Sequence, residues 1–446
     1  MKILLINPPR SPYNDILQFA PAEAAPFIHR RLIGPPLGLL TIASSLPEHD
    51  VMLFDMKGEY DLDPETPPLA ALTRRLLEEH RPDLIGVTVK TSEFNFATEI
   101  CREAKRYDPS VTTVVGGLHP TLRPSDFTDP AVDVIVPGQA VNTFRRIIRY
   151  IEEKKSLKGV PGIWLQGPGG PVRNPGARMA VDPAGADFVF PDRGRLKRWI
   201  STYRVGKSPD PSTYLFTSLG CPYRCTFCSI WGQFRGVYHQ REVESIITEL
   251  KQTDDYPVIR FADANTVVDI AFMDRLFDRI REEGIRKFFI MDIRADVAVK
   301  HPDLIAKMAR GGLKVVICGF ESFRDRELKR YHKESGTQQN LEAIRIFDVN
   351  GIMVRGNYVI PNDYTDADFD AIAEYSALHP VVYAGYTILT PMPGTVFHKQ
   401  VENQIIEHDY ARYNFFNSVM KTVLPYEKFH ERVGALWLIK KGTDVI

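Results

Sequence analysis

Three of the five cysteines, Cys221, Cys225 and Cys228, lie close together in the run SLGCPYRCTFCSIW with the spacing C-x3-C-x2-C. Three thiolates can ligate three irons of a cubane and leave the fourth iron open. An open iron suits a cluster that binds a substrate, by the same logic that leaves a catalytic zinc one free position. The spacing therefore predicts a [4Fe–4S] cluster on these three residues.

Structural zinc and three buried thiols without metal are the competing interpretations. Structural zinc usually takes four ligands in two pairs, and the two other cysteines do not supply a fourth nearby. Cys101 falls in a helical stretch of the first part of the chain, and Cys318 falls in a strand-like run. An odd cysteine count, clustered in this way, favours metal over disulfides.

The composition narrows the class of protein. A chain of 446 residues is expected to form two or three domains. Lys+Arg and Asp+Glu are equal at 56 each, which gives no electrostatic case for nucleic acid or an anionic membrane. The start, MKILLINPPR, has too short an apolar run for a signal peptide, and no stretch is long enough for a membrane span. We therefore expect a cytoplasmic protein without a nucleic-acid partner.

Residues 1–153 alternate apolar strand-like runs with amphipathic stretches. The expected strands are 2–7, 50–55, 83–89, 111–117 and 132–136, and the expected helices are 38–46, 69–80, 96–107 and 143–155. Such alternation is typical of a parallel sheet covered on both faces. It predicts a doubly wound, Rossmann-like α/β domain of flavodoxin-like strand order, with its binding crevice at the carboxyl ends of the strands.

A second α/β region follows a linker. Residues 154–211 are rich in Gly and Pro, with a small hairpin expected around GIWL and a short helix at 193–206. Residues 212–395 contain six βα units, which predicts a partial (β/α)6 barrel with its active site at the carboxyl ends of the strands. Its expected strands are 213–219, 257–263, 287–293, 314–320, 353–360 and 381–389. Residues 396–446 are expected to form a short helical region.

The cysteine loop, with aromatic Phe227 before the last cysteine and its place after the first strand of a six-unit barrel, resembles the radical S-adenosylmethionine (SAM) superfamily. The resemblance implies that the amino and carboxylate groups of SAM chelate the open iron. It also implies that an electron, from an external donor such as flavodoxin or ferredoxin, breaks the sulfonium bond. The 5′-deoxyadenosyl radical so formed would abstract hydrogen from a substrate.

The same resemblance suggests SAM contacts at the strand ends of the barrel. The candidates are Phe227, Asp263, Arg294, Glu321 and Asn357. An adenosine and a zwitterionic amino acid need several fixed donors and acceptors, so polar groups have a task there. The competing interpretation of each polar residue is an ordinary loop cap or ion pair.

The first domain has no G-x-G-x-x-G, which argues against a dinucleotide. Its pattern INPP…GPPLGLLTIASSL…DVMLFD…DLIGVTV…VVGGLHPT…DVIVPG resembles the cobalamin-binding domain fused to one large radical SAM class. The implied cobalamin contacts, over the carboxyl ends of the strands and facing the cluster loop, are Pro8, Pro9, Lys90, Thr91, Ser92, Glu93, Phe94, Gly116, Gly117, Leu118, His119, Pro137, Gly138 and Gln139. The small glycines permit close backbone approach to a large cofactor.

Two features of this domain bear on how it would hold cobalamin. It has no D-x-H-x-x-G, the motif of the cobalamin methyltransferases that ligate cobalt by histidine, so His119 is expected to be a polar contact and not a lower ligand. Residues 137–144, PGQAVNTF, lack the acidic positions that relatives show after the fifth strand.

The favoured function is a cobalamin-dependent radical methylase that acts on an unactivated carbon of a small molecule, lipid or natural-product intermediate. One SAM would give the radical, and a second would supply the methyl group that cobalamin carries. The alternatives are a radical cyclisation or ring rearrangement without methyl transfer, and a non-enzymatic metal-binding sensor. A methylthiotransferase is disfavoured because it needs a second three-cysteine cluster.

The substrate region is the least determined part. The insert at 11–32, with Phe19, Phe27 and His29, is long for a βα connection and could reach the active site or simply pack as a surface loop. Aromatic residues of the barrel could line an apolar cavity or form plain core. They are Trp231, Tyr358, Tyr383 and Tyr386. Residues 424–433 are a candidate lid.

Overall fold

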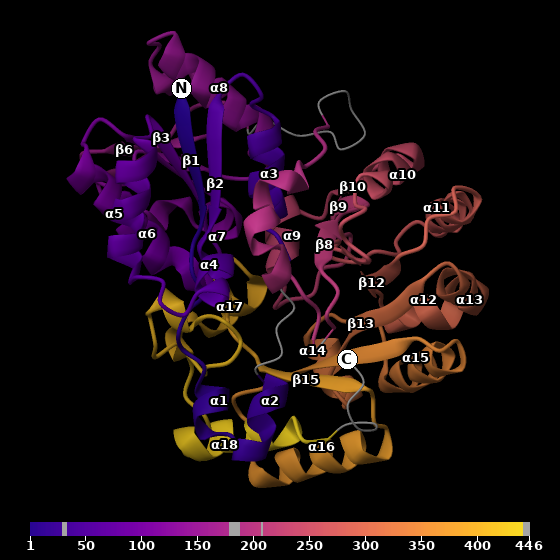
Figure 1. Ribbon diagram of the computed structural model, residues 1–446. Coiled ribbons are helices and arrows are strands. Elements are labelled where there is room, and N and C mark those ends of the chain that lie inside the picture. The colour runs from indigo at the N-terminus through magenta and orange to yellow at the C-terminus, as the bar shows by residue number, and fades with distance from the viewer. Residues whose placement is uncertain (29–33, 178–187, 207, 440–446) are drawn as a thin grey trace. The chain divides into compact units, whose positions relative to one another are not determined.

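The computed structural model describes residues 1–28, 34–177, 188–206 and 208–439 (Figure 1). The chain divides into two compact units. Unit 1 contains Met1–Pro12 and Pro35–Tyr203, and unit 2 contains Tyr13–Gly34 and Arg204–Ile446. The chain thus passes between the units three times, because a short N-terminal segment belongs to unit 2.

Unit 1 is a seven-stranded sheet in the order β2-β1-β3-β4-β5-β6-β7. The first five strands are parallel: β1 (Lys2–Asn7), β2 (Asp50–Asp55), β3 (Leu84–Thr88), β4 (Thr112–Gly116) and β5 (Val134–Val136). Their nearly continuous burial explains the apolar runs. The flavodoxin-like order expected from the sequence is confirmed, and the carboxyl ends of these strands share one edge.

The helices of unit 1 match the expected amphipathic stretches closely. They are α3 (Leu37–Ser44), α4 (Met56–Leu62), α5 (Leu69–His80), α6 (Phe94–Tyr107), α7 (Leu118–Leu122) and α8 (Val141–Glu152). The sequence missed two short helices, α4 and α7, because five to seven residues are too few to show a period.

The Gly/Pro-rich stretch after α8 continues unit 1. The hairpin expected around GIWL is present as β6 (Trp164–Gly167) and β7 (Gly170–Arg173), which extend the sheet antiparallel to β5. A 3₁₀ helix, η5 (Arg193–Thr202), then packs on β2 and α4. Its Trp199 Nε1 donates to Glu59 at 2.7 Å, and Tyr203 donates to Asp55 at 2.8 Å.

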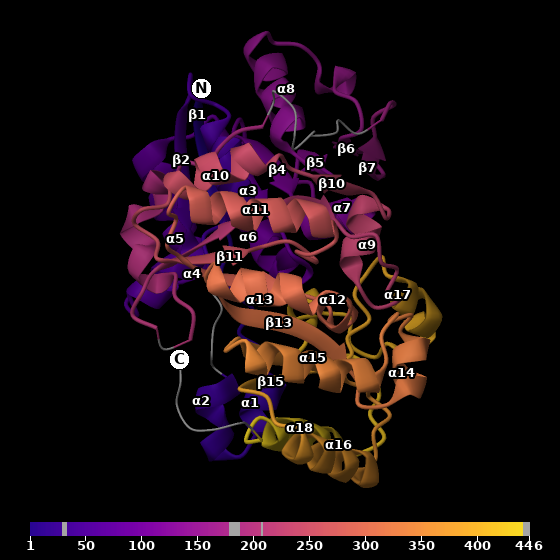
Figure 2. The same cartoon turned by 90° about the vertical axis from the view of Figure 1, so that its right-hand side faces the viewer.

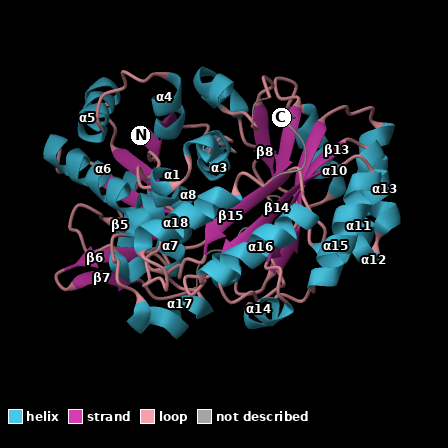
Figure 3. Ribbon diagram, turned by 90° about the horizontal axis from the view of Figure 1, so that it is seen from below, coloured by secondary structure: helices cyan, strands magenta, loops and turns pink. Residues whose placement is uncertain are grey.

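Unit 2 is built on a six-stranded parallel sheet in the order β15-β14-β13-β12-β11-β8. Its strands are β8 (Ser212–Leu215), β11 (Val258–Phe261), β12 (Phe288–Asp292), β13 (Leu313–Glu321), β14 (Met353–Ile360) and β15 (Tyr383–Ile388). Helices follow the strands and cover their outer face (Figures 2 and 3). They are α10 (Val243–Lys251), α11 (Ile270–Glu282), α12 (Ala295–Lys300), α13 (Pro302–Arg310), α14 (Asp325–Arg330), α15 (Thr337–Val349) and α16 (Asp366–Leu378). The expected six βα units are confirmed.

The first barrel strand is shorter than the sequence suggests. The run at 213–219 divides into β8 and a separate strand, β9 (Ser218–Gly220), which pairs antiparallel with β10 (Tyr238–Gln240). The cysteines follow β9 directly, and α9 (Ser229–Phe234) closes the loop. The cysteine loop therefore starts from a small two-stranded ribbon.

The insert of the first domain packs on the C-terminal region of unit 2. Helix α1 (Asp15–Phe19) lies against α18 (Tyr426–Leu436), with Phe19 edge-on to the Tyr426 ring at 6.4 Å. Asp15 is buried and accepts hydrogen bonds from Arg412 at 2.8 Å and from Tyr426. These contacts favour the interpretation that the insert packs as part of the fold. They also show that the candidate lid at 424–433 packs against the insert. His29 lies outside the described residues.

The rest of unit 2 is made of short helices and irregular segments, including α2 (Ala25–Ile28) and α17 (Val396–Val401). Among the described helices, none is long and apolar enough to cross a membrane.

Candidate active site

The cysteine loop turns sharply at Gly220, which has φ +90°. A side chain there would strike the carbonyl oxygen of Val237, so glycine is required both by conformation and by space. Past Gly220, the backbone N–H of Cys228 donates to the carbonyl oxygen of Cys225 at 3.1 Å, and Cys228 is the residue before the first turn of α9. All three cysteines are partly exposed.

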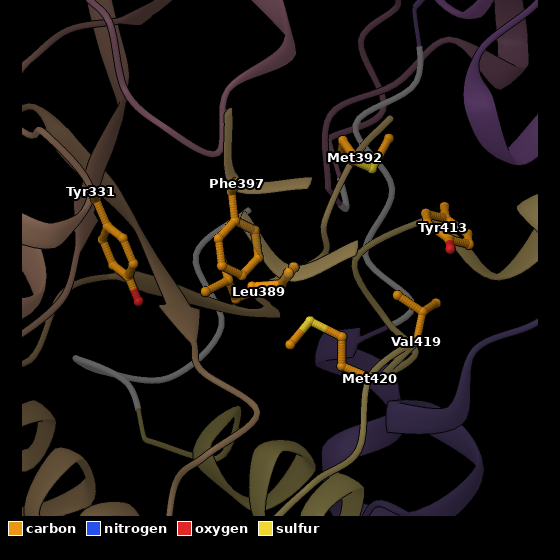
Figure 4. Packing of buried hydrophobic residues seen from close by; sticks show 8 residues of the cluster. Tyr331, Leu389, Met392, Phe397, Tyr413, Val419 and Met420 are labelled. Atoms are coloured by element: carbon orange, nitrogen blue, oxygen red, sulfur yellow. The ribbon is translucent and has the colours of Figure 1, made fainter. Parts of the chain in front are cut away.

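Two distant segments hold the loop in place. Thr226 donates its N–H to the carbonyl oxygen of Tyr331 at 3.0 Å, and Phe397 donates its N–H to the carbonyl oxygen of Thr226 at 2.9 Å. The ring of Phe227 packs edge-on against Tyr331 at 5.5 Å. Tyr331 belongs to an apolar core that also contains Leu389, Met392, Phe397, Tyr413, Val419 and Met420 (Figure 4), and the partly buried Phe227 packs against this core. Phe227 is therefore an anchor of the loop within this core.

Burial and the neighbouring positive charges shift the pKa of the thiols in opposite directions. Burial raises the pKa of Cys221, Cys225 and Cys228, that of Cys228 to about 11. The positive charges of Arg294 and Lys333 act in the opposite direction on Cys221 and Cys225. Backbone N–H groups of Tyr223 and Ile230 also favour the thiolates of Cys221 and Cys228 respectively. Partly exposed thiols beside two cationic side chains fit an iron–sulfur cluster, because bound iron keeps the sulfurs deprotonated.

The thiols are not arranged for a single ion. No group of three His, Cys, Asp or Glu side chains in the described part of the chain converges enough to hold one metal ion. A cubane does not need such convergence, because each thiolate ligates a different iron.

Asp263 fastens the segment that leads into the loop. Its Oδ1 accepts hydrogen bonds from the N–H and hydroxyl groups of Thr217 at 3.0 and 2.9 Å, and from those of Ser218 at 2.6 and 2.5 Å. Burial raises the pKa of this carboxyl to about 6 in spite of these bonds. With one oxygen shared by four donors, Asp263 is placed as a positioning group for β9.

Arg294 joins the third barrel strand to the cysteine loop. Its guanidinium carbon lies 3.6 Å from the ring centroid of Tyr223, and its Nε donates to Asp296 at 2.8 Å. The side chain is 8% exposed, and its Nη2 is buried without a hydrogen-bond partner among the described residues. A buried guanidinium with an unused donor beside the thiols is suited to bind a carboxylate of a ligand.

Glu321 forms a buried ion pair that sequence reasoning missed. Its Oε1 lies 2.9 Å from Nζ of Lys333, and Glu321 itself has φ +63°, which is unusual for a residue with a side chain. The carboxylate folds back over Gly319, where a Cβ would also lie 3.0 Å from Nζ of Lys333. Lys333 follows an irregular turn and has no periodic pattern, so nothing local in the sequence marked it as buried.

Asn357 and the barrel tyrosines separate onto opposite faces of the sheet. Asn357 pairs with Gly319, near the carboxyl end of β13, and with Gly385, in the middle of β15. Tyr358 instead stacks on Tyr386 at 5.5 Å and meets Tyr375 of α16 at 6.5 Å, which places it between the sheet and its covering helix. Tyr358 and Tyr386 are therefore part of the core, which is one of the two interpretations that the sequence left open.

Trp231 and Tyr383, the two other aromatic candidates, have different surroundings. Trp231 lies in α9, next to the cysteine loop, with the Arg224 guanidinium 5.8 Å from its ring. Tyr383 begins β15 and pairs with Arg355 of β14.

In unit 1, the candidate cobalamin contacts occupy loops along one sheet edge. Gly117 has φ +106°, and a Cβ there would lie 2.9 Å from the backbone nitrogen of Val89. The N–H of His119 donates to the carbonyl oxygen of Val89 at 3.0 Å, which ties the loop after β4 to the loop after β3. The accessible candidates are Pro9, Lys90, Ser92, Phe94, Gly116, Gly117, Leu118, Gly138 and Gln139, whereas Pro8, Thr91, Glu93, His119 and Pro137 are more enclosed. Small, accessible residues along this edge fit a large flat ligand.

His119 is enclosed by its own unit. Its side chain is 0% exposed, with Nδ1 3.3 Å from Thr91 Oγ1 and Nε2 3.4 Å from Asp126 Oδ2. Phe94 and Phe127 pack their rings against it at 5.1 and 5.7 Å. His119 is thus buried within unit 1 and packs beneath the loops of this edge.

A buried charge pair supports the loop after β3. Lys57, at the start of α4, forms an ion pair with Glu93, and the other oxygen of Glu93 accepts the N–H of Lys90 at 3.0 Å. Burial and the charge of Lys90 lower the pKa of Lys57 to about 8, although Glu93 acts to raise it. The sequence analysis did not identify Lys57, because the turn from β2 into α4 carries no recognisable motif.

Comparison with known proteins adds the family. The B12 binding domain family matches residues 25–148, and the radical SAM superfamily matches residues 215–376. An uncharacterized methyltransferase of Pyrococcus horikoshii is 28% identical over 94% of this chain and 88% of its own length. The hopanoid C-3 methylase of Methylococcus capsulatus is 26% identical over 89% of this chain and 74% of its own length.

A solved structure shows the same fold. The cobalamin-dependent SAM radical enzyme OxsB, with aqua-cobalamin and SAM bound, superposes with a TM-score of 0.72 at 17% identity. The match covers 97% of this chain but 65% of that chain, so this protein spans about two thirds of its length. At that identity the likeness shows the shared fold alone.

Proposed function

We propose that this chain, which belongs to the radical SAM enzymes with a B12-binding domain, methylates an unactivated carbon of a small molecule or lipid. The observation that carries the proposal is the pairing of a three-cysteine loop on a six-unit barrel with a doubly wound domain of flavodoxin-like order. The two relatives reported above, which align over most of the chain, are named an uncharacterized methyltransferase and a hopanoid C-3 methylase, and this supports the proposal.

The family implies three cofactors, and the described residues fit each of them. A [4Fe–4S] cluster would be held by Cys221, Cys225 and Cys228, the three partly exposed thiols of the loop. SAM would be bound by Arg294, Glu321 and Asn357, with Phe227 and Asp263 acting behind the loop. Cobalamin would lie on the accessible residues of the unit 1 edge. When bound, the cluster supplies an electron to cleave SAM, and cobalamin supplies the methyl group.

The side chains of this protein bind and orient. The free Nη2 of Arg294 is suited to the carboxylate of SAM, and the carboxylate of Glu321 is suited to its ammonium group. Lys333 holds Glu321 in place through their ion pair. Fixed, buried partners of this kind hold a reactive cofactor in one geometry and keep it from water.

An external reductant such as flavodoxin or ferredoxin is part of the proposal, because no described group of the chain supplies electrons. A cytoplasmic location is part of the proposal too. The absence of a nucleic-acid partner also belongs to it and is supported by the balance of 56 basic and 56 acidic residues.

The test is product analysis with labelled SAM. The protein, reconstituted with iron, sulfide and hydroxocobalamin, is incubated without oxygen with a reductant, methyl-deuterated SAM and a metabolite and lipid extract. A methylase gives 5′-deoxyadenosine, S-adenosylhomocysteine and an extract component that carries the label. A cyclase gives 5′-deoxyadenosine without label transfer, which would exclude methyl transfer, and a sensor protein gives none of these products.

A further inference from the structure

Beneath the strand-end residues, the inner face of the barrel carries a group of charges that the proposed SAM contacts do not use. The group is Arg260 of β11, Asp292 of β12 and Arg355 of β14. Strand alternation places all three on one face. Phe261, Phe289 and Tyr358 point the other way, toward the covering helices, since Phe289 packs on Phe277 of α11 at 5.9 Å and Tyr358 on Tyr375 of α16.

Asp292 and Arg355 lie at one level of the barrel, whereas Arg260 pairs with Ile290, two residues before Asp292, and reaches Asp292 with its side chain. Asp292 and Arg355 both pair with Ile317 of the strand between them, and Arg260 Nη2 lies 3.2 Å from Asp292 Oδ2. Arg355 precedes Asn357 by two residues on β14. At about 3.3 Å per residue it is therefore roughly 7 Å deeper than the strand-end residues proposed for SAM.

The charges of this group do not balance. One carboxylate faces two guanidinium groups, so the group has a surplus positive charge. Arg260 forms its ion pair with Asp292, and its Nε is buried without a hydrogen-bond partner among the described residues. Arg355 has no hydrogen bond or ion pair with any described residue, and burial together with the charge of Arg260 lowers its pKa to about 10. It is still a cation at neutral pH, held where a cation is disfavoured.

Solvent reaches this level although it lies inside the barrel. The side chains of Arg260 and Asp292 are 22% and 25% exposed. Both sit on central strands with a neighbour on each side, so the exposed surface faces the interior of the barrel. Aromatic rings flank the arginines: the Tyr214 ring lies 5.7 Å from the Arg260 guanidinium, and Tyr383 is the β15 partner of Arg355.

We propose that Arg355, backed by Arg260, binds an oxyanion of the substrate, a carboxylate or a phosphate-type group, inside the barrel. A planar guanidinium with no partner among the described residues offers paired donors that match the oxygens of either group. The surplus charge would be neutralised by one such anion. Asp292 fixes Arg260 and leaves Arg355 available. The inference deepens the proposed function, because it names the class of substrate, and it rests on that function.

Inorganic phosphate is the probe for this subsite. The unfolding midpoint of the cluster-loaded full chain is followed as phosphate is added, against sodium chloride of equal ionic strength. Wild-type protein should show a saturable rise, R355M should bind phosphate about tenfold more weakly or worse, and R355K should fall between them. R345M is the matched control, since Arg345 is an exposed helix residue paired with Glu342, and it should respond as wild type does. An equal response of R355M and wild type would overturn the proposal.

Two further measurements distinguish a substrate subsite from a SAM contact and from a purely structural role. The first uses the electron paramagnetic resonance signal of the reduced cluster, which changes when SAM binds. R355M should keep this response to SAM. Loss of the response would assign Arg355 to the carboxylate of SAM and overturn the substrate assignment. Without ligand, R355M should unfold at the same temperature as wild type or higher, because it removes an unpaired cation. A clearly lower midpoint would make Arg355 a structural partner of Asp292. None of these results depends on methyl transfer, so the proposed reaction can fail or stand independently.

Discussion

The guanidinium of Arg294 covers the ring of Tyr223, with its central carbon 3.6 Å from the ring centroid. Tyr223 stands between the first two cysteines, whereas Arg294 follows the third barrel strand, so this contact joins the cluster loop to the barrel wall. Arg294 also pairs with buried Asp296. One side chain thus holds the loop, satisfies a carboxylate and presents an unused donor to the site.

We expect Arg294→Met to destabilise the protein by about 3 kcal/mol, since it removes a desolvated cation–π contact and leaves Asp296 without its buried partner. The cluster-loaded variant should also bind SAM more weakly, as measured by the SAM-induced change in the electron paramagnetic resonance signal. Arg294→Lys should recover part of the stability but less of the SAM binding, because it lacks the planar fork. Full SAM binding in Arg294→Met would remove Arg294 from the SAM site.

Each of the single variants Cys221→Ala, Cys225→Ala and Cys228→Ala should lose the absorbance near about 400 nm that marks a cysteine-ligated iron–sulfur centre. Cys101→Ala and Cys318→Ala are the matched controls. Both cysteines are buried and far from ionising, since burial strongly raises the pKa of each thiol. Iron content and absorbance should stay at the wild-type level in these two variants. Loss of iron in Cys318→Ala alone would show that the ligand set is wrong.

Asp263→Asn should weaken the anchor of β9, and its effect on stability should depend on pH. Burial raises the pKa of Asp263 from about 3.8 to about 6, so the folded state holds its proton more tightly than the unfolded state does. The stability that this carboxyl contributes is complete below the unfolded pKa and is lost as the pH rises through 6. The stability advantage of wild type over the variant should therefore shrink by about 1 kcal/mol between pH 5 and pH 7. Urea unfolding at both values checks this, and an advantage that grows with pH would contradict it.

Lys57→Met should leave Glu93 buried without its partner and destabilise unit 1 by about 3 kcal/mol. Because Glu93 also holds the N–H of Lys90, the loop after β3 should lose its conformation and hydroxocobalamin should bind more weakly. The double variant Lys57→Met/Glu93→Gln should recover much of both, since no charge is left unpaired. Arg345→Met, which breaks an exposed pair, should cost less than about 1 kcal/mol. Equal losses in the single and double variants would show that the pair is not the cause.

The strands and the cysteine loop could be predicted because their signals are local. Apolar runs such as KILLIN and the spacing of Cys221, Cys225 and Cys228 are complete within a few residues, and β1 and β2 have the bounds expected.

The supporting residues could not be predicted because their partners are distant in sequence. Lys333 pairs with Glu321 across twelve residues, and Asp263 accepts hydrogen bonds from Thr217 and Ser218 of another βα unit. The sequence left open whether Tyr358 and Tyr386 line a cavity or form core, because an alternating strand does not say which of its faces carries the helices. The segment at 13–28 packs in unit 2 through Asp15 and Arg412, a pairing across almost the whole chain.

The central claim is that the loop of three cysteines holds a cluster that cleaves SAM. The most direct measurement is 5′-deoxyadenosine released when the anaerobic, iron- and sulfide-reconstituted protein meets dithionite and SAM. The account predicts release by wild-type protein and by Cys101→Ala, and none by Cys225→Ala. No 5′-deoxyadenosine from wild-type protein that carries a full cluster, with or without added substrate extract, would contradict it.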